Sequence, residues 1–275
     1  GLYTAPSDEA LLFDIKAMKE LGFNMIRKHI KVEPSRWYMH CDREGILVWQ
    51  DLPSPNLPAG HEAFARQNFE EEAVRIIDAF ENHPSIVQWV VFNEGWGQFD
   101  TERMTQVVID KVSPQSLVCC ASGWNDAEIG DIKDSHSYPY PSCPIDQKRA
   151  CVNGEYGGIT LKVPGHIWPG GDFGYTAVET PEDFTVMFND LADKIKDHYY
   201  YGLNAAVYTQ LSDVEIEKNG IYTYDRRILK PYSPTGELKD KILECINMPQ
   251  SDVKIQPVVS TAKEHKYKWK FITED

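Results

Sequence analysis

Two glutamates share a local pattern that could support chemistry. Glu94 ends the apolar run of "IVQWVVFNEGWG", and Glu155 follows a second apolar stretch in "NGEYGG". Two carboxylates facing one pocket can cleave a glycosidic bond. One donates a proton to the leaving oxygen, and the other attacks the anomeric carbon or activates water. Taken singly, each glutamate more often caps a helix or faces solvent, so the prediction depends on both meeting in one pocket.

Further polar and aromatic residues stand at or just beyond the ends of the predicted strands. These candidates are Arg27, His29, Asp51, Asn93, Trp96, Trp124, His136, Tyr138 and Tyr208. Aromatic rings suit a sugar, because its C–H faces pack on indole and phenol rings. The histidines could instead be core or rim residues, and the tryptophans plain packing. Only the joint pattern therefore predicts a sugar-binding pocket.

The elements that would position these residues alternate along the chain. Apolar runs predict seven strands, at residues 24–30, 46–51, 86–93, 117–123, 131–136, 151–155 and 205–211. Helical patterns accompany most of them. The first, at 7–22, has Ser7 as its N-cap and Gly22 as its stop. Strands separated by helices indicate an α/β fold of parallel βαβ units. We expect a (β/α)8 TIM barrel lacking its first strand, with a doubly wound sheet as the alternative.

Two connections fit the barrel less well. Those between the strands near residues 120, 133 and 152 are too short for full helices. We therefore expect short, degenerate helices after the fifth and sixth strands of the barrel. In such a barrel the active-site groups lie at the carboxyl ends of the strands, where the candidates above are found.

Composition limits the partners. The formal net charge of −14 offers no basic footprint for nucleic acid and disfavours an anionic membrane surface. No apolar run is long enough to span a membrane. The six cysteines show no metal-binding spacing, and the adjacent Cys119 and Cys120 indicate buried free thiols. A neutral small molecule or a sugar remains open as the ligand, with no metal or other cofactor expected.

The two ends of the chain suggest a piece of something longer. Residues 1–248 are expected to form the barrel domain, and 249–275 a linker with the start of a truncated β domain. The opening "GLYTAPSDEALLFDI" has no initiator methionine and no signal peptide, and is typical of the middle of a protein. Sequence features leave the compartment open.

Several stretches together resemble the catalytic barrel of glycoside hydrolase family 2. They are "GFNMIRKHIKVEPSRWYMHCDREGILVWQDLP", "HPSIVQWVVFNEGWG" and "NGEYGG", and the likeness runs from about residue 7 to 230. The family holds β-galactosidases, β-glucuronidases and β-mannosidases. The resemblance implies an exo-acting, retaining glycosidase with β-sandwich domains beside the barrel. Because sugar-degrading members are often exported, it also suggests a periplasmic or secreted parent.

The resemblance assigns roles to the candidates. Glu94 is similar to the acid/base and Glu155 to the nucleophile of the family. By the same likeness Asn93 would bind the sugar 2-hydroxyl, Arg27 would keep the nucleophile ionised, and Tyr138 would hydrogen-bond it. The remaining candidates would line the pocket of the non-reducing sugar: Asp51, His29, His136, Trp96, Trp124 and Tyr208.

The sequence departs from the family where the sugar would be chosen. Many members have tryptophan where this chain has Tyr208. In "EKNGIYTYDR", Glu217 and Asn219 stand where β-glucuronidases have the asparagine and lysine of an Asn-x-Lys motif. This disfavours recognition of a sugar carboxylate. A β-galactosidase-like specificity is the primary hypothesis, while "VWQD" resembles the β-mannosidase style and leaves that specificity open.

Rival hypotheses come from two other classes. A barrel that binds carbohydrate without hydrolysing it is one, because a missing strand would expose two sheet edges and could leave the fragment inactive or self-associated as a homo-oligomer. A metal-dependent hydrolase using His29, His136 and the acids is the other. It lacks an early His-x-His pair, which counts against it.

Overall fold

The structure is a computed structural model that describes residues 5–54 and 62–249. Its elements follow the predicted order. They are α1 (Asp8–Glu20), β1 (Met25–Lys28), α2 (Ser35–Glu44), β2 (Leu47–Asp51), α3 (Glu62–Phe80), β3 (Ile86–Asn93), α4 (Thr101–Lys111), β4 (Leu117–Ser122), β5 (Ile132–His136), β6 (Ala150–Gly157), β7 (Ile159–Thr160), β8 (Thr176–Ala177), α5 (Pro181–Tyr199), β9 (Leu203–Thr209) and α6 (Glu237–Ile246). The seven longer strands are those predicted from the apolar runs.

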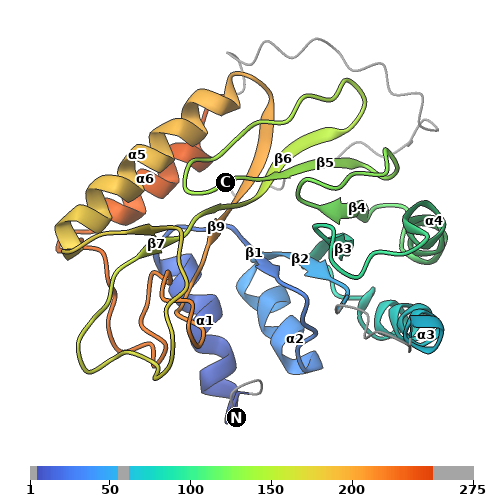
Figure 1. Ribbon diagram of the computed structural model, residues 1–275, viewed down its shortest axis with the longest axis horizontal. Helices are drawn as coiled ribbons and strands as arrows, with labels where there is room; N and C mark the ends of the chain where they lie inside the picture. Colours follow the sequence, from blue (N-terminus) through green and yellow to red (C-terminus); the bar gives the residue numbers. More distant parts are fainter. Residues whose placement is uncertain (1–4, 55–61, 250–275) are drawn as a thin grey trace, which may run out of the picture.

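Among the described residues, every pair of named strands is parallel, and the spatial order of the longer strands follows their sequence order. One sheet has the order β1-β2-β3-β4, and a second has the order β5-β6-β9. The backbone bond from Asp131 N to Val118 O, at 2.8 Å, links the two sheets beside β4 and β5. Helices lie outside the strands (Figure 1). This is the arrangement of a TIM barrel, so the doubly wound alternative, which requires a reversal of strand order, is wrong.

The barrel is interrupted between β9 and β1. Among residues 5–54 and 62–249, β1 pairs only with β2, and β9 pairs only with β6. The strand count therefore agrees with a barrel in which the described residues supply seven of eight strands.

Local sequence signals explain where the helices begin and end. Helix α1 starts at Ser7, whose hydroxyl accepts a hydrogen bond from Ala10 N at 3.3 Å, and the chain turns at Gly22 with φ +96°. Helix α5 starts at Thr180, whose hydroxyl accepts from Asp183 N at 3.1 Å. Helix α6 was not predicted. It packs Leu238 and Ile242 into the apolar cluster shared with α5.

The connections after β4 and β5 contain bends and an isolated bridge at Gly130 but no helix, so the expected degenerate helices are absent from them. An ion-pair network takes their place. Arg149 donates to both oxygens of Asp126 at 2.7 and 2.8 Å, and Lys133 Nζ lies 2.6 Å from Asp126 Oδ2. Arg149 Nε also donates to Asp146 at 2.8 Å. Charged side chains thus hold together two connections that are too short for packed helices.

One layer of the core fills the barrel interior. Five strands, β2 to β6, each contribute one buried side chain to it: Trp49, Val90, Cys119, Ile132 and Val152. Met25 from β1 and Ala205 and Val207 from β9 pack against this layer. The opposite strand faces pack on the helices in two further clusters. The apolar layer is a rigid floor for the polar side chains at the carboxyl ends of the strands.

The predicted thiols and domain limits can be partly checked. All six cysteines are free, and Cys119 and Cys120 are fully buried. The predicted linker and truncated domain at 249–275 lie, apart from Pro249, outside the described residues. Within residues 5–54 and 62–249, no helix has both the length and the apolar character that a membrane span requires.

Candidate active site

The buried Arg27 guanidinium is the centre of the site. It is held by Asp51, to which Nε and Nη2 donate at 3.1 and 2.8 Å, and the two side chains are only 2% and 1% exposed. Its remaining donors reach Asn93 Oδ1 at 2.8 Å and Glu155 Oε1 at 2.9 Å. Asp51 was expected to line the pocket of the sugar; the structure places its carboxylate in the interior, where it aligns Arg27.

Glu155 lies on β6 among several donors. Arg27 Nη1 contacts one carboxylate oxygen, and the Tyr138 hydroxyl donates to the other at 2.7 Å. Burial works to raise the pKa of Glu155, but the Arg27 charge and then His136 and His29 outweigh it and lower the pKa. A carboxylate that is kept ionised can act as a nucleophile.

Glu94 stands directly after β3 with φ +52°, a backbone conformation that turns the chain away from the strand. Glu94 N donates to Ser122 O at 2.7 Å, which fixes this turn against β4. His136 Nδ1 lies 2.9 Å from Oε1, and Trp96 Nε1 donates to Oε2 at 2.8 Å. The hydrogen bond with His136, followed by that from Trp96, lowers the pKa of Glu94.

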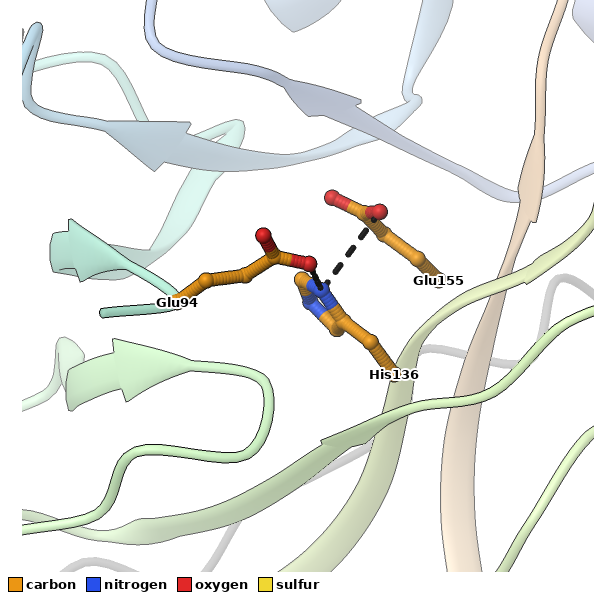
Figure 2. A group of neighbouring side chains, drawn as sticks. All are labelled: Glu94, His136 and Glu155. Carbon is orange, nitrogen blue, oxygen red and sulfur yellow. Dashed lines mark hydrogen bonds and ion pairs between the residues drawn. The ribbon is translucent and has the colours of Figure 1, made fainter. Parts of the chain in front are cut away.

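His136 lies between the two glutamates (Figure 2). Its Nδ1 is 2.9 Å from Glu94 and 3.4 Å from Glu155. One ligating atom of each of the three residues lies within 4.8 Å of the others. The two carboxyl groups therefore lie close together, with the imidazole of His136 in contact with both.

The same three side chains could in principle approach a cation. The Arg27 guanidinium lies 2.9 Å from Glu155, however, and its fixed positive charge would repel a divalent ion placed there. His29 Nδ1 lies 3.6 Å from Glu155, but the His29 side chain is 56% exposed and is not one of the three grouped side chains. The donor set therefore fits proton chemistry better than metal ligation, and we assign no metal ligands.

Aromatic rings surround the glutamates. Trp96 and Trp124 are 58% and 61% exposed, and their rings meet edge to face with centroids 6.4 Å apart. Tyr138 stacks on Tyr175 at a centroid separation of 3.6 Å. These rings are suited to packing against the C–H faces of a sugar.

The structure places Tyr208 outside the site, contrary to expectation. Its ring lies in the apolar cluster of α5, with centroid separations of 5.1 Å to Phe188 and 5.6 Å to Tyr156. Its neighbour Thr209 faces the site instead, and its Oγ1 accepts a hydrogen bond from Tyr138 at 2.9 Å. Successive strand residues point to opposite faces, so a shift of one residue accounts for the error.

Three further residues belong to the site and were not among the predicted site residues. Ser122 and Asp134 form hydrogen bonds beneath His136. Asp134 could have been found, because it is two residues before His136 on one strand and must share its face. Tyr175 comes from the irregular connection between β7 and α5, where no sequence period indicates the direction of a side chain.

The paired glutamates and aromatic rings at the ends of the barrel strands are typical of a glycoside hydrolase. The comparison with known protein families leads to the same class. The model described as "Glycosyl hydrolases family 2, TIM barrel domain" matches residues 5–243. The chain therefore belongs to glycoside hydrolase family 2.

Relatives carry several enzyme names. A β-galactosidase of Clostridium acetobutylicum is 23% identical over 86% of this chain and 30% of its own length. A mannosylglycoprotein endo-β-mannosidase of Lilium longiflorum is 24% identical over 86% of this chain and 26% of its own length. A β-glucuronidase of Bacteroides fragilis is 32% identical, but over only 30% of this chain and 12% of its own length. The chain thus spans less than a third of each relative.

Solved structures share the fold. A β-galacturonidase of Eisenbergiella tayi, solved with galacturonate, matches with a TM-score of 0.63 at 16% identity, over 86% of this chain and 48% of that one. A β-glucuronidase of Bifidobacterium dentium matches with a TM-score of 0.62 at 17% identity, over 87% and 44%. At such identities the likeness supports the barrel and is no guide to the sugar.

Proposed function

We propose that this barrel is the catalytic part of a retaining exo-β-glycosidase that acts on terminal β-linked sugars, with a β-galactosidase-like specificity. The observation that carries the proposal is the pair formed by Glu94 and Glu155, whose nearest ligating atoms lie within 4.8 Å of one another across His136. A short separation suits direct attack on the sugar, whereas an inverting enzyme needs about 6.5–9.5 Å to admit a water molecule.

Each step uses a side chain of the site. Glu155 attacks the anomeric carbon while Glu94 protonates the departing oxygen, which leaves the sugar bonded to Glu155. Glu94 then takes a proton from water, and that water releases the sugar with its original configuration. Asn93 Oδ1 is already bonded to Arg27, so its amide nitrogen is the group available to the sugar 2-hydroxyl.

The proposed glycone is neutral. Burial, followed by the Glu217 and Glu155 carboxylates, raises the pKa of the Tyr175 phenol to about 12, which places Glu217 near the aromatic wall of the site. A uronate would meet these carboxylates and lose free energy by repulsion. The neighbouring cation does not compensate, because Lys218 is only 4% exposed and its Nζ donates to Gly171 O and to Asp172.

The test is hydrolysis of p-nitrophenyl β-glycosides of galactose, glucose, mannose and glucuronic acid. The assay uses this chain and the longest natural reading frame that contains it. We expect release from the galactoside, and a fall of at least about 10⁴-fold in Glu155→Gln. Glu71→Gln, on the exposed face of α3, is the matched control and should retain full activity.

Other outcomes would change the proposal. Preference for the mannoside or the glucuronide would contradict the proposed β-galactosidase-like specificity but would be consistent with the proposed two-glutamate mechanism. Binding of a sugar by the folded protein without any turnover would favour a carbohydrate-binding role. Activity that disappears with a chelator would favour the metal-dependent alternative.

A further inference from the structure

A chain of hydrogen bonds runs from the proposed acid into the interior of the barrel. Glu94 Oε1 lies 2.9 Å from His136 Nδ1, and His136 Nε2 lies 2.8 Å from Ser122 Oγ. Ser122 Oγ lies 2.5 Å from Asp134 Oδ2. Four side chains capable of exchanging protons thus lie in series, with Arg27 Nη1 also 3.4 Å from His136 Nε2. Of the four, only Glu94 has an appreciably exposed side chain, at 22%.

The strands hold this chain in place from three sides. Asp134 and His136 are two residues apart on β5, and Ser122 ends the neighbouring strand β4. Gly154 on β6 donates its N–H to Asp134 Oδ1 at 2.6 Å. A Cβ atom at Gly154 would lie 2.3 Å from Asp134 Oδ2 and 2.6 Å from Ser122 Oγ, so the backbone can approach this closely only at a glycine.

We propose that Asp134 is a buried proton reservoir for Glu94, connected to it through Ser122 and His136. The inference deepens the proposed function, because it rests on Glu94 as the general acid. Asp134 and Ser122 do not touch the sugar, and are therefore positioning residues.

The transfer balances in three coupled steps. Asp134 gives its carboxyl proton to Ser122 Oγ, and the Ser122 hydroxyl gives its own proton to His136 Nε2. His136 gives the proton on Nδ1 to Glu94. Asp134 ends as a carboxylate and Glu94 as a carboxylic acid, while His136 changes from one neutral tautomer to the other.

The electrostatic surroundings of Asp134 support a resting proton there. Burial raises the pKa of Asp134 to about 6, against the opposing effects of His136 and Arg27. Cys119, on β4, also faces this carboxyl group, and burial raises the pKa of its thiol well above the usual value, which keeps it neutral. The interior carboxyl can therefore be protonated near neutral pH.

Glu94 has the opposite tendency in the open site. It faces His136, Trp96 and, further off, His29, and their combined effect lowers its pKa. Glu155 is the other carboxylate against His136. A sugar that covers Glu94 would remove water from it and favour its neutral form, which would draw the proton along the chain.

Asp134→Asn tests the reservoir with little change in shape. Gly154 N would still donate to the amide oxygen, so the amide nitrogen would point at Ser122 and mimic the protonated acid. The Ser122 hydroxyl would then donate to His136 Nε2 permanently, with Nδ1–H donating to an ionised Glu94. Asp134→Asn thus keeps the hydrogen bonds of the resting protein, but its amide cannot release a proton to Ser122.

Kinetics give the first readout. We expect Asp134→Asn to slow hydrolysis of a methyl glycoside by about 10²-fold, since acid catalysis contributes roughly 10²–10⁴-fold. A 2,4-dinitrophenyl glycoside needs no proton on leaving, and its rate should be nearly unchanged. The alkaline limb of the pH profile should move to lower pH, because Glu94 would then titrate alone. Equal loss on both substrates would overturn the proposal.

The state of His136 gives a second readout that needs no activity. In protein labelled with ¹⁵N-histidine, we expect the signals of His136, identified by their absence from His136→Gln, to switch from the Nδ1–H to the Nε2–H tautomer when a saturating, non-hydrolysable thio-β-galactoside covers Glu94 and the proton moves to it from Asp134. Asp134→Asn and Ser122→Ala should abolish the switch. Asp131→Asn, which changes the carboxyl group bound to Val118 N just before the same strand, should keep it.

The two readouts separate the two ideas. His136 signals that respond to the thio-β-galactoside alike in wild type and Asp134→Asn would overturn the reservoir, whether or not the protein hydrolyses glycosides. A tautomer switch in a protein that cleaves no glycoside would instead contradict the proposed function, while still supporting proton transfer between Asp134 and Glu94. Thermal unfolding of each variant shows that it is folded before either result is used.

Discussion

Arg27 Nη1 lies 2.9 Å from Glu155 Oε1, and this contact joins the buried framework of the barrel to the proposed nucleophile. The guanidinium is 98% covered and is aligned by Asp51. Its charge favours an ionised Glu155, while the proton chain beneath His136 can return a proton to Glu94. Under the proposed function, Glu155 would thus be ionised while Glu94 carries a proton in the first step, as a double displacement requires.

Arg27→Lys should therefore damage both folding and turnover. Lysine keeps the positive charge, but it cannot bind Asp51 with two donors and also reach Asn93 and Glu155. We expect a loss of about 3 kcal/mol in the free energy of unfolding and a fall of about 10²-fold or more in kcat/KM. Urea unfolding and steady-state kinetics measure the two effects.

The control for this prediction is Arg103→Lys. Arg103 also binds both oxygens of one carboxylate, that of Glu70, at 3.0 and 2.9 Å, but its side chain is 50% exposed. Its replacement should cost less than about 1 kcal/mol. If the two variants unfolded alike, the central place given to Arg27 would be wrong.

Tyr138→Phe should change the pH dependence of turnover. The Tyr138 hydroxyl donates to ionised Glu155, and this bond helps to lower the pKa of the carboxyl group. Without it the pKa of Glu155 rises, so the acidic limb of kcat/KM moves to higher pH. A hydrogen bond to a charged group is worth about 1.5–3 kcal/mol, which predicts a loss of roughly 10- to 100-fold at the optimum.

Tyr38→Phe is a matched control, because the Tyr38 hydroxyl is bonded to Glu33 N and Gln50 in the core, away from Glu155. It should lower stability and leave the acidic limb in place. An acidic limb that moved equally in both variants would count against a role of Tyr138 on the nucleophile.

The residues at the strand ends were predictable because a parallel barrel places the carboxyl ends of all its strands on one face. Apolar runs separated by helices indicate parallel strands, and the carboxyl ends of such strands meet on one face. Arg27, Asn93, Glu94, His136 and Glu155 come together for this reason. These five residues come together as long as each strand ends close to the end of its apolar run.

Side-chain direction was harder to predict. Along β9, Ala205 and Val207 face the barrel interior, while Ala206 and Tyr208 pack in the cluster of α5. Thr209 therefore faces the site and Tyr208 does not. Because both sets are apolar or aromatic, the sequence pattern does not say which set faces inward. Tyr175 depends on the path of a long connection, which no local period determines.

Asp126→Asn should destabilise the protein in a pH-dependent way. Hydrogen bonds from Arg149, and further bonds from Lys133 and the backbone, hold the pKa of Asp126 well below its usual range. A depressed carboxyl pKa contributes stability above the unfolded pKa of about 3.9, and this is lost as pH falls through the folded pKa. We expect a loss of about 2 kcal/mol at pH 7 that shrinks towards pH 2.

Urea unfolding at a series of pH values measures this difference. Asp172→Asn is the control, because the Asp172 side chain, although paired with Lys162 and Lys218, is 53% exposed. It should leave the free energy of unfolding nearly unchanged at every pH. A constant loss in Asp126→Asn between pH 7 and pH 2 would show that its charge is not the cause.

Trp96→Phe should act on the acid through one atom. The indole Nε1 donates to Glu94 Oε2 at 2.8 Å, and this bond contributes to the lowered pKa of Glu94. Phenylalanine keeps an aromatic surface but has no donor, so the pKa of Glu94 rises. The alkaline limb of the pH profile, which reports loss of the acid proton, should therefore move to higher pH, opposite in direction to Asp134→Asn.

Trp124→Phe is the control, because it removes an indole of similar exposure that makes no hydrogen bond to Glu94. It should weaken sugar binding without moving the alkaline limb. A limb that moved equally in both tryptophan variants would mean that the wall of the pocket, and not the Nε1 hydrogen bond, determines how Glu94 titrates.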